Sequence, residues 1–262
     1  MRKMENEMKK VIRLAIIGIL SLAFIFAMDV NRQVMGWGPL PALVSSGLGC
    51  DSNTLFLIHS DSTDGSTVFQ DSGGSATCPH TITANGNVHH ETDQKYFGAT
   101  SVYFDGTTDT LQVATPDTDW AFGTGNFTID MWIYKAAGNM AIIGNTYNTN
   151  GFWHIRVVAD FLVFNYGVGT ETTTNFTITA NTWTHIAVER HGNNLNMFKN
   201  GTISTVIGDL TGINFSGLAD LYIGNGFGGP NDYSGYIDEI RISNTARYGG
   251  VNFSVPTSSY CQ

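Results

Sequence analysis

The sequence predicts an all-β protein, and three observations support this prediction. The 262 residues include 30 Gly and only 13% charged residues, a composition that favours strands and turns. Short runs of alternating apolar and polar residues follow one another with turn residues between them, which is typical of a β-sandwich or barrel. No stretch keeps a helical period, and no internal repeat suggests a propeller or a solenoid.

The N-terminal segment is typical of a targeting sequence. A cationic stretch from Lys9 to Arg13 precedes an apolar run from Leu14 to Met28. This run is shorter than the roughly 20 residues of a spanning helix, and Ala27 offers a small residue for cleavage. We therefore expect residues 1–28 to be a signal peptide or a membrane anchor helix. In either case, the rest of the chain is predicted to be secreted or held at the cell surface.

The remaining chain divides into a linker and one domain. Residues 29–49 include a stretch rich in Gly, Pro and Ser and are predicted to be a linker. Residues 50–262 are about the size of one large sandwich. The first residue of the protein is Met1 or Met8, since residues 1 to 7 add mixed charge that a signal does not need.

Strands are expected throughout the domain. Asn200 and Gly201 both tolerate positive φ and lie between two strand-like runs, which predicts a type I′ hairpin inside a three-stranded meander from Trp183 to Ser204. The clearest predicted strands are 54–61, 100–106, 126–134, 152–158, 161–167, 183–190, 195–201, 221–226 and 235–243.

Alternation in the run "FTIDMWIY" assigns residues to two faces of a sheet. One face would be buried between two antiparallel sheets, and the other would carry aromatic rings and an acid, as many sugar-binding surfaces do. Trp132 is better explained as a core or structural surface residue than as a ligand platform. The first set is Phe127, Ile129, Met131 and Ile133, and the second is Thr128, Asp130, Trp132 and Tyr134.

The run "SGYIDEIRIS" places two acids side by side in a predicted strand. Adjacent residues of a strand point to opposite faces, so Asp238 and Glu239 cannot act on one substrate atom. Strict alternation places Tyr236, Asp238, Ile240 and Ile242 on one face, where a buried Asp238 would need amides, a cation or a metal. Glu239 and Arg241 would then form a surface pair on the other face.

Composition and motifs argue against several functions. The formal net charge is -9 and the few Lys and Arg form no basic stripe, so a nucleic-acid partner is not expected. The sequence contains no Gly-x-Ser-x-Gly elbow and no His-Glu-x-x-His string. We therefore predict a protein that is not an enzyme.

Three cysteines, Cys50, Cys78 and Cys261, allow one disulfide in an exported protein. Cys50 and Cys261 bracket the domain, and a bond between them would join its ends. Cys78 could replace either of them, and the spacing leaves this choice open.

Several strings, in this order, resemble the LamG-like jelly roll of the concanavalin A-like lectin/glucanase superfamily. They are "LFLIHSDSTDGSTVFQDSGG", "FGATSVYFDG", "FGTGNFTIDMWIY", "WTHIAVERHGNNLNMFKNG" and "GYIDEIRISNTARY". The resemblance extends from about Asn53 to Val255 and implies a two-sheet antiparallel jelly-roll sandwich. Laminarinase-like enzymes of this superfamily carry Glu-x-Asp-x-x-Glu on one strand, and the sequence lacks that string. This fold serves many functions, so it does not settle this one.

Calcium is the cofactor that the sequence favours. It binds six to eight oxygens, which loop-rich acidic sandwiches supply, and the resembled family commonly holds the metal with acids in such loops. The candidate ligands are Asp71, Asp105 and Asp238. Asp71 and Asp105 are equally explained as residues that cap turns with their own side chains.

The leading functional hypothesis is lectin-like recognition of a glycan or of a cell-surface or matrix component. The glycine-rich loop 224–235 is the candidate contact surface: Phe227 and Tyr233 would stack on a sugar face, while Asn231 and Asp232 would bind hydroxyls. The alternatives are a structural or adhesive module of a cell-surface or viral appendage assembly and, more weakly, a glycoside hydrolase. A membrane partner is expected only through an uncleaved anchor.

Overall fold

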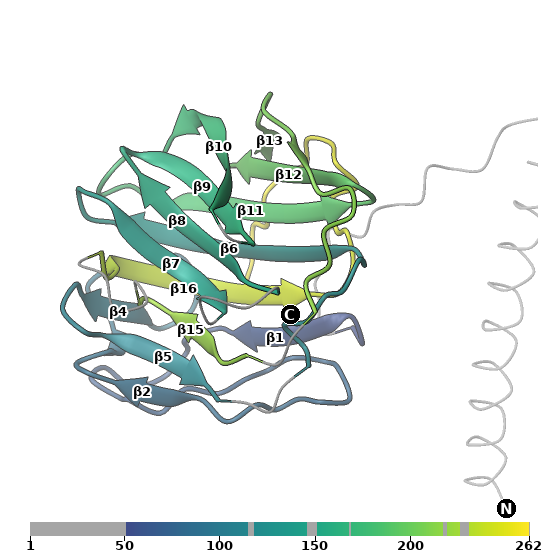
Figure 1. The fold of residues 1–262 in the computed structure, drawn as a ribbon. Helices are drawn as coiled ribbons and strands as arrows, with labels where there is room; N and C mark the ends of the chain where they lie inside the picture. The colour runs from purple at the N-terminus through teal and green to yellow at the C-terminus, as the bar shows by residue number, and fades with distance from the viewer. Residues whose placement is uncertain are drawn as a thin grey trace, which may run out of the picture. The chain divides into compact units, whose positions relative to one another are not determined.

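The computed structural model describes residues 51–114, 118–145, 151–167, 169–216, 219–225 and 231–261. Within these ranges the chain forms strands and no helix, in two antiparallel sheets that face each other (Figure 1). No described helix therefore qualifies as a membrane span. The predicted signal or anchor, residues 1–28, and the predicted linker, residues 29–49, lie outside the described residues.

The larger sheet has nine strands. Seven of them follow the order β13-β12-β11-β6-β16-β4-β3, while β1 pairs with β16 and β14 pairs with β12. Its strands are β1 (Thr54–Ile58), β3 (His89–Glu91), β4 (Ser101–Asp105), β6 (Phe127–Lys135), β11 (Thr184–His191), β12 (Asn194–Lys199), β13 (Thr202–Ile203), β14 (Gly208–Asp209) and β16 (Ser234–Ser243).

The smaller sheet has seven strands in the order β10-β9-β8-β7-β15-β5-β2. Neighbours in chain order, such as β8 and β9, form hairpins, whereas β15 inserts between β7 and β5. Its strands are β2 (Thr83–Asn85), β5 (Thr110–Val113), β7 (Met140–Asn145), β8 (Trp153–Val158), β9 (Phe161–Tyr166), β10 (Thr170–Thr177) and β15 (Leu221–Ile223).

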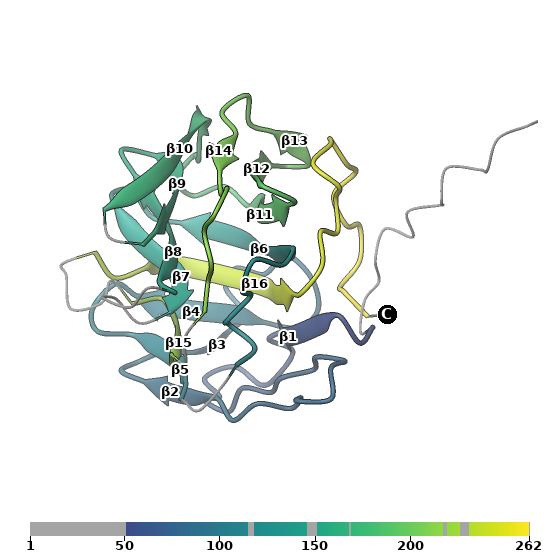
Figure 2. The same ribbon diagram turned by 45° about the vertical axis from the view of Figure 1, so that its right-hand side comes forward.

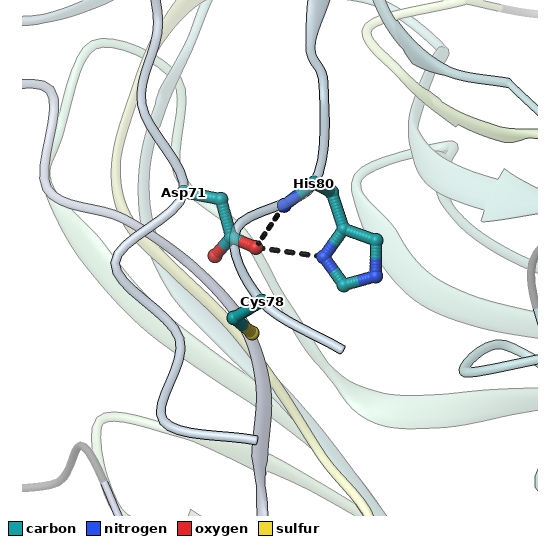
Figure 3. A group of neighbouring side chains, drawn as sticks. All are labelled: Asp71, Cys78 and His80. Carbon is teal, nitrogen blue, oxygen red and sulfur yellow. Dashed lines mark hydrogen bonds and ion pairs between the residues drawn. The ribbon is translucent and has the colours of Figure 1, made fainter. Parts of the chain in front are cut away.

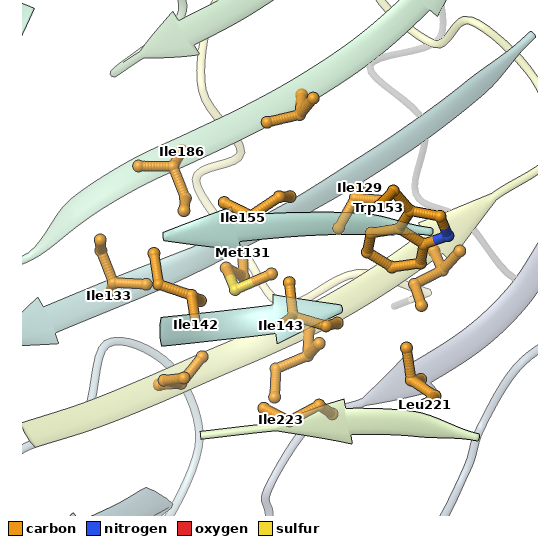
Figure 4. Packing of buried hydrophobic residues seen from close by; sticks show 14 of the residues in the cluster. Ile129, Met131, Ile133, Ile142, Ile143, Trp153, Ile155, Ile186, Leu221 and Ile223 are labelled. Carbon is orange, nitrogen blue, oxygen red and sulfur yellow. The ribbon is translucent and has the colours of Figure 1, made fainter. Parts of the chain in front are cut away.

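The hydrophobic core lies between the sheets, as expected for a sandwich. Met131 from β6, Ile155 from β8 and Ile186 from β11 are buried in one cluster (Figure 4). The four residues predicted for the inner face of β6 all belong to this cluster. The alternation of that run therefore assigned its core face correctly.

The predicted hairpin at Asn200 and Gly201 is confirmed. Both residues have positive φ, 48° and 76°, and they connect β12 to β13. Gly201 is required for a second reason: a Cβ atom there would lie 2.0 Å from the carbonyl oxygen of Phe253. With β11, the two strands form the predicted meander.

A β-bulge overturns the face assignment in the closing strand. Asp238 pairs with Trp132 and Arg241 pairs with Asp130, so Glu239 and Ile240 together lie opposite the single residue Met131. Glu239 takes up the extra residue with a φ of 53°. The alternation shifts by one at this point. Asp238 therefore does not share a face with Ile240 and Ile242, which belong to the inner core.

The outer face of the nine-stranded sheet carries a second buried layer. Figure 2 shows the chain after β16, in yellow, beside this sheet and away from the smaller one. The main-chain N–H groups of Tyr248 and Gly250 donate to Glu189 at 2.6 and 2.7 Å, and that of Tyr260 donates to Glu239 at 2.8 Å. Buried carboxylates thus hold the C-terminal segment 244–261 against the sheet.

An ion pair lies at the centre of this layer. Asp130 Oδ1 accepts a hydrogen bond from Arg241 Nε at 3.0 Å, and Oδ2 accepts one from Nη2 at 2.6 Å. The hydroxyls of Tyr248 and Tyr260 also donate to Oδ2. Burial would raise the pKa of Asp130, but the charge of Arg241 outweighs it and holds this pKa at about 2. The predicted surface pair of Glu239 and Arg241 is therefore wrong, since both are buried and Arg241 pairs elsewhere.

Candidate functional site

A row of aromatic rings crosses the outer face of the nine-stranded sheet. Strand register creates it: His89 pairs with Tyr103, Tyr103 with Tyr236, and Tyr236 with Tyr134. The ring centroids are 5.2, 5.1 and 5.8 Å apart along these steps, and Trp183, just before β11, lies 5.6 Å from Tyr134. We call these five residues the aromatic row.

The aromatic row is accessible to solvent along its length. All five residues are partly exposed, unlike the buried residues around Asp130. Tyr96 extends the surface, since the residue is 37% exposed. Its ring stacks on buried Trp132 at 3.5 Å and lies 5.9 Å from Trp183. A contiguous set of partly exposed rings on a sheet is a surface that can stack against flat apolar faces of a ligand.

Acidic side chains flank one end of the row. Burial and the charges of Asp105, Asp109 and Glu91 raise the pKa of Tyr103. Burial, then Asp93 and other neighbours, raises the pKa of Tyr236. Both phenols therefore stay protonated at neutral pH and can donate hydrogen bonds. The negative potential here disfavours an anionic ligand.

The predicted contact loop only partly matches this surface. Phe227 lies outside the described residues. Tyr233 is fully buried: its ring packs against Phe104 at 5.6 Å and its hydroxyl donates to the carbonyl of Tyr236 at 3.1 Å. The role predicted for the Tyr233 ring is therefore wrong, because a ring in the core cannot stack on a sugar.

Two other residues of that loop remain near the surface. Asn231 is exposed, and its carbonyl accepts a hydrogen bond from the N–H of Ala141 at 2.8 Å. Asp232 Oδ2 accepts one from the N–H of Thr108 at 2.9 Å. Both side chains lie on the segment that leads into β16 and Tyr236, and their binding role stays a prediction.

The three acids predicted as calcium ligands do not converge on one ion. Asp71 Oδ1 accepts from the N–H groups of Leu57 and Gly73, and Asp105 Oδ1 accepts from the N–H of Thr107 at 2.7 Å. Among the described residues, one group of three or more His, Cys, Asp or Glu brings its ligand atoms within 4.8 Å of one another, and it includes neither Asp105 nor Asp238. Both turn-capping hydrogen bonds expected for Asp71 and Asp105 are present.

Asp238 is buried and is held by main-chain amides. Its Oδ2 accepts hydrogen bonds from the N–H groups of Tyr96 and Phe97 at 2.8 and 3.0 Å. Its Oδ1 has no hydrogen-bond partner among the residues that the structure describes. Burial raises the pKa of Asp238 to about 7, although the two amides oppose this shift. The residue anchors the segment that carries Tyr96 over Trp132.

The structure describes two of the three cysteines, Cys78 and Cys261. Cys78 is a free thiol, which removes it as a partner of Cys50 or Cys261. Cys50 lies outside the described residues, so the bond between Cys50 and Cys261 stays a prediction.

Sequence reasoning missed most of the aromatic row. Tyr134 was placed on the outer face by alternation, but His89, Tyr103 and Trp183 come from distant segments. Alternation within each strand indicates which way a ring points, whereas the pairing of β3, β4, β16 and β6 brings the rings together. A pairing register cannot be read from one sequence when the partners are far apart in the chain.

Together, the strands and their side chains define a two-sheet β-sandwich with an aromatic outer face. The family model described as the concanavalin A-like lectin/glucanases superfamily matches residues 104–249, more than half of the chain. The chain belongs to this superfamily. No match was found among curated proteins.

Solved structures with a similar fold include binding domains of toxins. The binding domain of Paraclostridial Mosquitocidal Protein 1 has a TM-score of 0.59 and 14% identity, over 76% of this chain and 50% of that one. The botulinum neurotoxin DC binding domain in complex with SialylT has a TM-score of 0.54 and 14% identity, over 76% and 50%. The same domain in complex with rat synaptotagmin II has a TM-score of 0.55 and 15% identity, over 74% and 49%. This chain thus spans about half the length of these structures, and the likeness concerns the fold.

Proposed function

We propose that this protein is a non-catalytic recognition domain that binds neutral glycans through the aromatic row. The observation that carries the proposal is the run of partly exposed rings from His89 to Trp183, adjacent on five neighbouring segments. Sugar rings have apolar faces that stack on aromatic side chains, and their hydroxyls accept and donate hydrogen bonds. The acidic end of the row favours uncharged saccharides over sialylated or sulfated ones.

The comparisons support a glycan or cell-surface partner in general terms. The similar botulinum neurotoxin domains were crystallised with a sialylated ligand in one case and with synaptotagmin in the other. The acidic surroundings of Tyr103 and Tyr236 lead us to propose a different glycan class for this chain.

Several buried carboxylates are engaged in ways that support a non-catalytic role. A glycosidase needs two carboxyl groups facing one substrate. Asp130 is paired with Arg241, Glu189 accepts main-chain N–H groups, and Glu239 contacts His59 Nδ1 at 2.9 Å. Release of reducing ends from a polysaccharide would contradict the proposal.

Replacing Tyr236 by Ala is expected to weaken glycan binding about tenfold, because it removes the central ring of the row. The test is a glycan array, followed by calorimetry with the best neutral ligand. Tyr222→Ala is the matched control, since Tyr222 lies in β15 of the other sheet, paired with Gln112 and Gly144, and binding should be unchanged. An equal loss of glycan affinity in both variants would contradict the aromatic row as the binding site. A preference for sialylated glycans would contradict the proposed glycan class.

An array on which no sugar binds would instead favour a structural or adhesive module. If sugars do bind, the same array with a calcium-selective chelator tests whether calcium takes part, since a calcium-dependent lectin would then lose its glycan-binding signal.

We also propose that the domain is exported and closed by a disulfide between Cys50 and Cys261. The free thiol of Cys78 supports this pairing because it leaves those two cysteines for the one bond. Alkylation without reductant, followed by peptide mass mapping, should label Cys78 alone. Alkylation of Cys261 under these conditions would refute the pairing.

A further inference from the structure

We propose that Asp71, Cys78 and His80 form a binding site for one Zn²⁺ ion. These residues lie on the segment between β1 and β2, and their ligand atoms all lie within 4.8 Å of one another. Figure 3 shows the Asp71 carboxylate directed at His80, with Cys78 beside them. Thiolate sulfur, imidazole nitrogen and carboxylate oxygen are the three ligand types that Zn²⁺ takes in proteins. Calcium, by contrast, prefers oxygen ligands alone.

The carboxylate and the imidazole are largely withdrawn from solvent, and Cys78 is half-buried. The side chain of Asp71 is fully buried and that of His80 is 5% exposed. Asp71 Oδ1 accepts main-chain N–H groups from Leu57 at 2.9 Å and Gly73 at 2.8 Å. These bonds fix the carboxylate and leave Oδ2 directed at the His80 N–H, at 2.9 Å, and at His80 Nδ1, at 2.7 Å. Oδ2 and Nδ1 are thus the pair of atoms that an ion would bridge.

A carboxylate lies near the second ring nitrogen of His80. His80 Nε2 lies 3.4 Å from Asp119 Oδ2. A histidine that binds a metal through one nitrogen almost always gives the other N–H to a carboxylate or carbonyl, which fixes its tautomer. Without an ion, Nδ1–H donates to Asp71 Oδ2. In the tautomer with the proton on Nε2, Nδ1 would offer its lone pair to an ion beside Asp71.

The Cys78 sulfur lies in a space beside Gly73, which has no side chain. Cys78 Sγ lies 3.0 Å from the carbonyl of Leu55 and 3.3 Å from Ser75 Oγ. A Cβ atom at Gly73 would lie 2.3 Å from this sulfur and 3.1 Å from Asp71 Oδ1. Only glycine at position 73 therefore leaves room for the thiol beside the carboxylate.

The same geometry disfavours a nucleophilic role for Cys78. A cysteine nucleophile needs an imidazole nitrogen within hydrogen-bond reach of the sulfur. Nδ1 of His80 contacts Asp71 Oδ2 at 2.7 Å, and Nε2 lies 3.4 Å from Asp119 Oδ2. On binding Zn²⁺, the Cys78 thiol loses its proton to solvent and the thiolate bonds to the ion, so one proton is released at neutral pH.

The test uses the purified full chain, kept free of reductant, with Co²⁺ as a spectroscopic probe and Zn²⁺ competed against a chromophoric chelator. We expect one ion per chain and the ultraviolet charge-transfer band of a cobalt thiolate. Cys78→Ser should abolish that band and weaken Zn²⁺ binding at least about tenfold, and Asp119→Asn should weaken it about tenfold. His89→Gln is the matched control, because His89 lies on the aromatic row, and it should bind Zn²⁺ as the wild type does.

Two outcomes would overturn the site. One is a wild-type chain that gives no cobalt thiolate band, a result that does not depend on how any variant folds. The other is Zn²⁺ binding that Cys78→Ser leaves unchanged. Thermal unfolding gives a second readout, since saturating Zn²⁺ should raise the midpoint of the wild type and of His89→Gln but not that of Cys78→Ser.

Discussion

Replacing Arg241 by Met is expected to lower the free energy of unfolding by about 3–5 kcal/mol. The substitution keeps an unbranched side chain similar to the aliphatic part of arginine but leaves the Asp130 carboxylate, fully buried, without its cation. Arg241 also covers the ring of Tyr260, with its guanidinium carbon 3.8 Å from the ring centroid. Urea denaturation at pH 7, followed by tryptophan fluorescence, measures the loss.

Arg156→Met is the matched control for this prediction. Arg156 pairs with Glu171 at 2.9 Å, but their side chains are 35% and 49% exposed. An ion pair in that setting contributes at most about 1 kcal/mol. Similar losses in the two variants would mean that the Asp130–Arg241 pair is solvated in solution. Replacing both partners, with Asp130→Leu added to Arg241→Met, should recover part of the loss, since no unpaired charge then remains.

The sequence was sufficient to predict the inner face of β6, the strand that carries Asp130. Alternation placed Phe127, Ile129, Met131 and Ile133 inward, and the core contains all four. This worked because the inner face of a sandwich is apolar and repeats every second residue. The order of strands in the meander was equally local, since the Asn200–Gly201 turn fixes the pairing of β12 with β13.

The outer face of the same strand could not be derived in this way. Alternation predicts a surface position for Asp130, because the sequence does not show that segment 244–261 returns to cover it. The hydroxyls of Tyr248 and Tyr260 reach Asp130 from 118 and 130 residues away. A polar residue in an alternating run indicates the outer face of a sheet. Whether that face is exposed to solvent depends on contacts between distant parts of the chain.

The bulge in β16 was hidden for a related reason. "YIDEIRI" reads as an unbroken strand, and Glu239 is not a residue that favours positive φ. In the structure its carboxylate contacts His59 and accepts the N–H of Tyr260, contacts that hold it in that conformation. The shifted alternation sends Arg241 outward to Asp130 while Ile240 stays in the core. The one-residue bulge thus places Arg241 beside Asp130, and it leaves Asp238 buried without a cation.

Asp238 is expected to make the stability of the protein fall as the pH rises from about 4 to about 7. Its pKa is raised to about 7 by burial, from the ordinary value of 3.8 for an aspartate. Between these values the unfolded chain has lost the proton while the folded chain retains it, so unfolding releases a proton and higher pH favours it. The contribution is about 1.4 kcal/mol per pH unit across this window, and it levels off above the folded pKa.

Asp238→Asn isolates this contribution. The amide oxygen can still accept the N–H groups of Tyr96 and Phe97, while the titrating group is removed. Any cost of burying the added NH₂ group is independent of pH, and the buried Glu189, whose pKa burial also raises, is present in both proteins. The stability of the variant relative to the wild type should therefore improve by about 2–3 kcal/mol between pH 5 and pH 7, measured by urea denaturation at each pH. A difference that stays constant with pH would show that Asp238 is ionised throughout, and that the two amides suffice to hold a buried anion beneath Tyr96.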